Sequence, residues 1–221
     1  LVPHCRFLHD RMLQAAYHSL TEGDRQKAHL KIGRLLYSHT EPEQLDQQLF
    51  AIVEQLNQGR ALIETELERI QLATLNLQAA EKAKQASVWE AAVDYAKIGL
   101  ALLTSTSSDQ HWQKHYHLSF ALYKSLAECL YLSGDAQQSE ALYENLLSHC
   151  KNTTEKAELC AARLIQMIGS GQWQQGAEIG KLGLELLGFA CPADSEAIER
   201  LLPEEQRKFE QHLTKKPIES F

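Results

Sequence analysis

The sequence predicts an all-α protein, an α–α superhelix built from helical hairpins that stack on one another. Strong helix formers dominate a chain that has only 5 prolines and 11 glycines among 221 residues. Runs of Val, Ile, Thr and aromatic residues, which are typical of strands, are nearly absent. Apolar residues recur at spacings of three and four over most of the chain, as they do along one face of a helix.

This periodicity predicts a series of helices separated by short breaks. After a first helix that ends near Leu20, we expect helices over about 25–38, 45–59, 63–86, 89–103, 110–132, 136–147, 154–168 and 173–187. Asp24 is a candidate cap for the helix over 25–38. Gly188 and Pro192 end the last of these helices, and the charged tail from 193 onward is expected to hold one or two short helices.

Residues on the apolar faces of these helices are predicted to form the core. In the helix over 25–38 we expect four residues to be buried, His29, Ile32, Gly33 and Leu36. We expect its four cations to face water, Arg25, Lys27, Lys31 and Arg34. Ile165 and Ile168 are expected inside, and we interpret Trp89 and Trp173 as core anchors rather than ligand platforms.

Three turns share one pattern, in QASVWEAAVDYAKIG, LSGDAQQSEALYENL and IGSGQWQQGAEIGKLG. Each second helix opens at Trp89, Ala136 or Trp173, and a small residue follows three positions later. Those small residues are Ala92, Ser139 and Gly176; the next core positions are Ala96, Tyr143 and Gly180, then Gly99, Leu146 and Gly183. Small residues are required where neighbouring helices touch closely, so the pattern predicts paired helices.

This pattern resembles the second half of a tetratricopeptide repeat, whose period is about 34 residues. The openings of the second helices lie about 47 and then about 37 residues apart, and the full consensus is not present. We therefore expect irregular, tetratricopeptide-like hairpins. A stack of such hairpins leaves a curved surface that usually binds protein or ligand.

Charge and cysteine content exclude several classes of function. The net charge is −7, and an acidic surface argues against a nucleic-acid partner. No apolar run approaches the roughly 18 residues of a membrane span, and no signal-peptide pattern is present. The 5 cysteines are odd in number and well separated, which favours reduced thiols and a cytoplasmic protein. The first residue is Leu1, which predicts that the chain begins inside a longer gene product.

Three patterns could suggest chemistry, and a structural interpretation competes with each. Gly171 and Gly176 have the spacing of a phosphate-binding loop, but Ala177 and Glu178 follow where Lys and Ser or Thr are required. The histidines at 111, 115 and 117 could suggest zinc, although no HExxH arrangement accompanies them. The trio His9-Asp10-Arg11 could look catalytic, but such trios more often form structural ion-pair clusters.

The thiols of Cys129 and Cys160 lie on apolar helix faces, as buried cysteines do. The sequence therefore predicts no catalytic, cofactor-binding or metal-ligating residue. It also predicts no cofactor, and it does not indicate an oligomeric state.

The N-terminal phrase FLHDRMLQAAYHSL, followed by DRQKAHLKIGRLLYS, resembles a segment just after the ATPase module of large bacterial signalling proteins. These proteins join a serine/threonine kinase, an AAA-type (STAND-like) ATPase, helical repeats, a GAF domain and a sensor histidine kinase. The matching positions are Phe7, Leu8, His9, Asp10, Arg11, Gln14, Ala15, Ala16 and Tyr17, then His29, Ile32, Gly33, Arg34 and Leu36. Later phrases, among them AAVDYAKIGLALL, LYLSGDAQQSEALYE and KKPIESF, resemble its repeat region.

The resemblance implies three parts: the end of a winged-helix-like unit over 1–37, tetratricopeptide-like repeats over 38–192, and a charged helical tail or linker over 193–221. It implies a parent with ATP-binding and kinase activities, none of whose catalytic residues falls within this chain. We therefore expect a non-catalytic scaffold that mediates protein interaction or signal relay.

Two alternatives stay open. One is the sensor or effector-binding region of a STAND ATPase-type transcriptional activator. The other is an enzyme with a zinc site at His111 and His115.

Overall fold

The structure is a computed structural model that describes residues 10–104, 110–192 and 195–215. Throughout these ranges the regular elements are helices, with no strand, which confirms the all-α class. The chain divides into two compact units, residues 1–149 and 150–221. Of the described helices, none combines the length and the apolar character that crossing a membrane requires.

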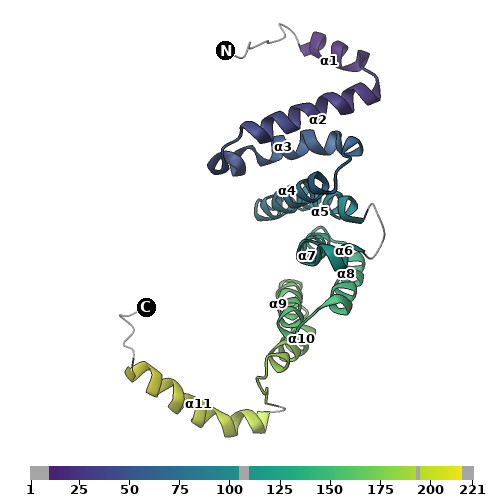
Figure 1. Cartoon of the computed structure of the whole chain (residues 1–221). Helices are drawn as coiled ribbons and strands as arrows, with labels where there is room; N and C mark the ends of the chain where they lie inside the picture. Colours follow the sequence, from purple (N-terminus) through teal and green to yellow (C-terminus); the bar gives the residue numbers. More distant parts are fainter. Residues whose placement is uncertain (1–9, 105–109, 193–194, 216–221) are drawn as a thin grey trace. The chain divides into compact units, whose positions relative to one another are not determined.

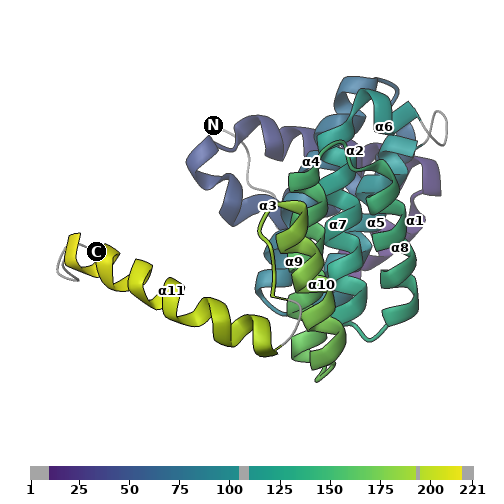
Figure 2. The ribbon, with the colours of Figure 1, turned by 90° about the horizontal axis from the view of Figure 1, so that it is seen from below.

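The first unit is a series of antiparallel helical hairpins (Figure 1). Its elements are α1 (Asp10–Ser19), α2 (Glu22–His39), the 3-10 turn η1 (Pro42–Gln44), α3 (Leu45–Gln58), η2 (Arg60–Leu62), α4 (Glu66–Gln85), α5 (Trp89–Thr104), α6 (Gln110–Lys114), α7 (Tyr116–Leu132) and α8 (Ala136–His149). The pairs α2/α3, α4/α5 and α7/α8 form the hairpins. Helix α4 contacts α3, α5 and α7, and Figure 2 shows α4, α5 and α7 side by side.

The second unit contains one hairpin and one further helix. Helices α9 (Thr153–Gly169) and α10 (Trp173–Leu186) pack against each other, and α11 (Ser195–Lys215) follows. One or two short helices were expected in the charged tail; the structure has a single helix of 21 residues, which continues through Pro203. Its many Glu, Lys, Arg and Leu residues favour helix, and Lys208 forms ion pairs with Glu204 and Glu205 one turn away.

The three turns that share a sequence pattern also share one backbone geometry. Each contains one residue in the left-handed region, with φ of 59° at Ser87, 96° at Gly134 and 77° at Gly171. In each, the next amide donates to a carbonyl five residues earlier: Val88 to Ala83, Asp135 to Leu130, and Gln172 to Met167, at 2.9, 2.9 and 2.8 Å. This is the Schellman arrangement that ends a helix. The repeat pattern therefore predicted equivalent turns correctly.

Small residues lie at the helix contacts, as predicted. The equivalent positions Ala92, Ser139 and Gly176 are all buried. At Gly99, a Cβ would lie 2.7 Å from Cδ2 of Leu122, so glycine allows α7 to approach α5 closely. At Ser139, the hydroxyl donates a 2.7 Å hydrogen bond to the carbonyl of Ala127, which satisfies the only polar group that this small side chain brings into the hairpin.

Two predicted helix boundaries are wrong. The helix expected over 110–132 is interrupted at His115, whose φ of −131° and ψ of 43° are not helical, so α6 and α7 are separate helices. Helix α2 begins earlier than predicted, and Thr21 is its cap because its side chain accepts a hydrogen bond from the Asp24 amide. A threonine three residues before an acidic residue is a capping signal that outweighs Asp24 here.

Several predicted core residues are exposed. Ile32 is 45% exposed while Leu30 is buried, because the contact face of α2 is set by Leu30 and Gly33. Trp173 is 64% exposed and Ile165 is 72% exposed, and Ile168 is also exposed. Trp89 and His29 are half-buried. Apolar periodicity identified the helices correctly but did not determine which apolar flank has a neighbour to pack against.

Candidate protein-interaction surface

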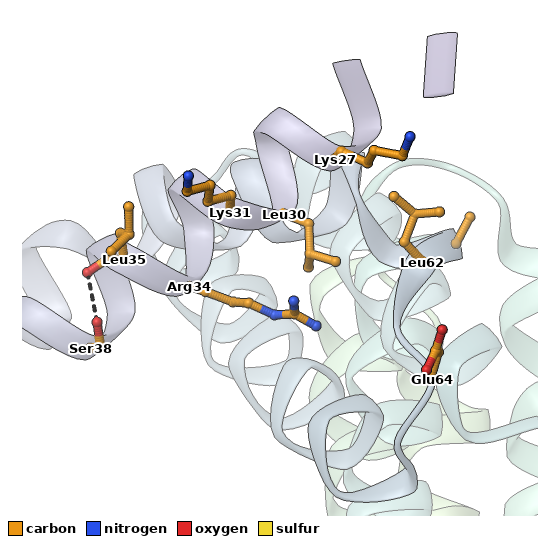
Figure 3. Close-up of a pocket in the computed structure, with 9 residues that line it drawn as sticks. Lys27, Leu30, Lys31, Arg34, Leu35, Ser38, Leu62 and Glu64 are labelled. Atoms are coloured by element: carbon orange, nitrogen blue, oxygen red, sulfur yellow. Dashed lines mark hydrogen bonds between the residues drawn. The ribbon is translucent and has the colours of Figure 1, made fainter. Parts of the chain in front are cut away.

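A groove of about 800 Å³ lies between α2 and the segment around η2 (Figure 3). Its lining combines cations with apolar side chains. The cations are Lys27, Lys31 and Arg34, and the large apolar residues are Leu30, Leu35 and Leu62. Figure 3 shows Leu30 and Arg34 pointing from α2 into the space in front of Leu62 and Glu64. We refer to this feature as the α2–η2 groove.

Helical spacing places the charged and apolar residues of the α2–η2 groove. Lys27, Lys31 and Leu35 follow one another at intervals of four, so they share one face of α2. Leu30 lies one row deeper and is buried. The η2 turn approaches α2 closely because it begins after Gly59, where a Cβ would lie 2.6 Å from the Cβ of Leu30. The glycine at this position therefore allows Leu62 of η2 to lie beside α2 in the groove.

The cations of the groove differ in how firmly they are held. Arg34 donates from Nε and Nη2 to the two carboxylate oxygens of Glu68, at 2.7 and 2.8 Å. This hydrogen bonding raises the pKa of the Arg34 guanidinium further, so the charge is permanent. Nζ of Lys27 lies 3.5 Å from Oδ1 of Asp24, in a weaker ion pair that is exposed to water. Lys27 and Lys31 are exposed and so accessible to a carboxylate from outside.

Leu35 adds an exposed apolar side chain to the charged groove. Its side chain is about half exposed, and Ile32 on the neighbouring face is similarly exposed. Large apolar side chains that remain in water next to a concave surface are typical of protein-binding sites. The sequence predicted the exposure of Lys27, Lys31 and Arg34 correctly. It did not predict the groove, because Ala61 and Leu62 lie far from them in sequence.

The three histidines that could suggest a metal site differ in their surroundings, and His117 is exposed. His111 is buried in α6 beside Trp112 and Tyr123, with ring centroids 5.3 and 5.9 Å away. His115 lies at the helix break, and its Nε2 is 3.3 Å from Oε1 of Glu66. That hydrogen bond lowers the pKa of the Glu66 carboxyl. Within the described residues, no three His, Cys, Asp or Glu side chains form a group that could hold a metal ion.

The candidate glycines and cysteines lie in a turn and in helix contacts. Gly171 forms the left-handed turn, and Gly176 lies against Met167 and Leu164 in the α9–α10 contact. Burial raises the pKa of the Cys129 thiol to about 11, and it also raises the pKa of the Cys160 thiol. Both thiols are therefore protonated near neutral pH and are poor nucleophiles. His9 and the side chains of Asp10 and Arg11 lie outside the described part of the structure, as do Phe7 and Leu8.

An aromatic cluster that the sequence did not single out lies where α6, α7 and α8 meet. Trp112 is buried and stacks on His149, with ring centroids 4.1 Å apart and an interplanar angle of 11°. Tyr123 stacks on it as well, at 5.1 Å. The Tyr116 hydroxyl donates a 3.2 Å hydrogen bond to the carbonyl of His149. The cluster links α6 and α7 to the end of α8.

Comparison with known proteins gives one informative similarity. No protein-family model matches the chain, and no solved structure matches it. The chain is 29% identical over 180 residues to the hybrid signal transduction histidine kinase G of Dictyostelium discoideum. The match covers 72% of this chain but only 5% of that much longer kinase. The chain is thus similar to a small part of a signal-transduction protein.

Proposed function

We propose that this chain is a non-catalytic helical-repeat scaffold that mediates protein interaction or relays a signal within a larger ATPase and sensor-kinase protein. The observation that carries the proposal is the α2–η2 groove, in which exposed cations lie beside the exposed side chain of Leu35. Packed hairpins support it, because stacked helix pairs typically present surfaces for other proteins. The similarity to a histidine kinase supports the signalling context.

The domain organisation belongs to the same proposal. Residues 1–37 are assigned to the end of a winged-helix-like unit, 38–192 to tetratricopeptide-like repeats, and 193–221 to a charged helical tail. The parent protein is expected to be cytoplasmic and to carry STAND-type ATPase and serine/threonine kinase modules. The histidine kinase similarity favours this parent over a transcriptional activator, because it supplies the sensor-kinase part.

A substitution in the groove tests the proposal in the parent protein. Leu35→Glu places a charge where a bound protein would bury a leucine, and we expect it to weaken the contact and change kinase autophosphorylation several-fold. Leu67→Glu is the matched control, since Leu67 is 78% exposed on α4 and does not line the groove. Equal effects of the two variants, or no effect of Leu35→Glu, would contradict the groove as the contact surface.

A second measurement tests the non-catalytic part. The purified 221-residue chain is incubated with labelled ATP and magnesium, and hydrolysis and self-phosphorylation are followed. We expect neither reaction. Turnover that copurifies with the chain through gel filtration would overturn the proposal.

A further inference from the structure

One flank of the α9/α10 hairpin exposes large apolar side chains. Gly176 and Gly183 on α10 mark the line of contact with α9, where a Cβ at Gly183 would lie 3.0 Å from the Cβ of Cys160. With 3.6 residues per turn, the large apolar side chains to one side of this line are those of Ile165, Ile168, Trp173 and Leu184. All four are exposed. We refer to these four residues as the open flank.

The α4/α5 hairpin shows what normally covers this flank. The shared turn geometry aligns Ser87 with Gly171, so Leu100 of α5 corresponds to Leu184 of α10. Leu100 is only 8% exposed, whereas Leu184 is 46% exposed. The same alignment pairs Lys84 with Ile168.

Helix α7 covers the flank in the α4/α5 hairpin. It contributes Glu128, which lies 2.7 Å from Nζ of Lys84, and Leu122, which fills the space beside Gly99. Helix α7 belongs to the helices that follow the hairpin in sequence. At the open flank, Ile168 occupies the position that Lys84 has in α4. The partner of Ile168 must therefore be apolar, whereas Lys84 pairs with a carboxylate.

The helix that follows α10 has the matching chemistry. Ile198, Leu201 and Leu202 are spaced as i, i+3 and i+4 and therefore form one apolar stripe on α11. Each of the three is about half exposed. The opposite face carries Arg200, Glu204 and Arg207. An amphipathic helix of this kind is stabilised mainly by packing its apolar stripe against another surface.

The connection between the two elements is short enough to favour an intramolecular contact. Helix α10 ends at Leu186 and α11 begins at Ser195, which is a tether of roughly 25–30 Å when fully extended. Such a tether holds the two surfaces at an effective concentration on the order of millimolar. A weak apolar contact is therefore populated within one chain before a second chain competes for it.

We infer that α11 binds the open flank of α9/α10 through Ile198, Leu201 and Leu202, in the place that α7 takes on α4/α5. The contact buries two apolar surfaces that otherwise lie in water. It also covers the exposed side of the α9/α10 hairpin with a helix whose outer face is charged, as terminal elements of repeat proteins require. The inference does not depend on the proposed function, because it concerns only the second unit.

Amide hydrogen exchange of the whole 221-residue chain, followed by mass spectrometry of its peptides, tests the inference. We expect the amides of α11 to exchange roughly 10- to 100-fold more slowly than those of a free peptide of the same sequence. Replacing Leu201 and Leu202 with serine should remove this protection and speed exchange along α9 and α10. Replacing Arg200 and Arg207 with serine is the matched control, with the same number of new serines on the opposite face.

Two results would overturn the inference. One is free-peptide exchange of α11 in the unmodified chain. The other is protection that increases with protein concentration together with a dimer in analytical ultracentrifugation, because the occupant of the open flank would then be a second copy.

A reciprocal variant, Ile165→Asp, separates docking from simple helix loss. It leaves the α11 sequence intact, and it should still release α11 if the two surfaces touch.

Discussion

Asn57 and Asn76 exchange two side-chain amide hydrogen bonds of 2.9 Å each across the contact between α3 and α4. Both side chains are buried, and Nδ2 of Asn76 also donates to the carbonyl of Leu72 at 2.9 Å. A buried amide without its partner is costly, so the two bonds favour one relative placement of the helices. The pair thus fixes the register of the second hairpin on the first.

We expect Asn76→Ala to lower the free energy of unfolding by about 2–3 kcal/mol, because Asn57 then loses both hydrogen bonds in a buried site. Adding Asn57→Ala to the Asn76→Ala variant should lower the free energy of unfolding by less than Asn57→Ala does in the wild type. The double variant leaves no buried amide without a partner. Urea unfolding of the two single variants and the double variant measures this coupling. Additive losses would show that the two amides do not stabilise each other.

Replacing Ser87 with glycine should stabilise the protein. Ser87 has a φ of 59°, and the equivalent position in the two sister turns is a glycine. An L-residue pays a steric penalty in this region that glycine avoids, so we expect a gain of about 0.5–1 kcal/mol. Thermal unfolding provides the measurement. Ala86→Gly is the control, because Ala86 has a negative φ of −82° and glycine there should be destabilising.

A methyl group at Gly99 should destabilise the α5–α7 contact. The new Cβ would lie 2.7 Å from Cδ2 of Leu122, and the Leu122 side chain is fully buried. We expect Gly99→Ala to cost about 1–3 kcal/mol in denaturant unfolding. Gly23→Ala should be nearly neutral, since no atom lies within 4 Å of a Cβ at that position. Leu122→Ala removes the side chain that the new methyl group meets. A combined loss for the double variant that is smaller than the sum of the two single losses would identify the clash as the cause.

The Cys129 thiol should make stability depend on alkaline pH. Burial raises its pKa to about 11 in the folded protein, against about 8.5 in an unfolded chain. Above pH 8.5 the unfolded state loses this proton first, so the contribution of Cys129 is complete below that pH and is lost as pH rises toward 11. Unfolding of the wild type and of Cys129→Ala between pH 7 and 10.5 should give a difference that shrinks with pH. A constant difference would contradict the assignment.

The helices and turns were predictable because their causes are local. Glycine at 134 and 171 and small residues at 92, 139 and 176 are needed by the backbone of one hairpin, so the sequence pattern carried them directly. The break at His115 was missed because nothing in the residues around it is a helix breaker. Tertiary packing of Trp112 between Tyr123 and His149 accompanies that break, and it involves residues distant in sequence.

Burial and the groove depend on contacts that a periodic pattern does not specify. Ile32 and Leu30 are equally apolar, and the packing of α2 against α3 and against the η2 turn after Gly59 places Leu30 in the core. For the same reason Lys27 and Lys31 were predicted as exposed residues but not as part of a concave surface. The exposure of Trp173 likewise depends on which element packs against that side of its hairpin, and the local periodicity does not specify this.

Helix α4 has a consequence for how the first unit responds to an applied displacement. It is 20 residues long, or about 30 Å, and it contacts α3 and α7 while packing on α5. Its salt bridge from Lys84 to Glu128 and its amide pair with Asn57 attach it to both neighbours through polar contacts of fixed geometry. A displacement of the α2/α3 hairpin is therefore transmitted to the α7/α8 hairpin through the single continuous helix α4, without passing through a loop.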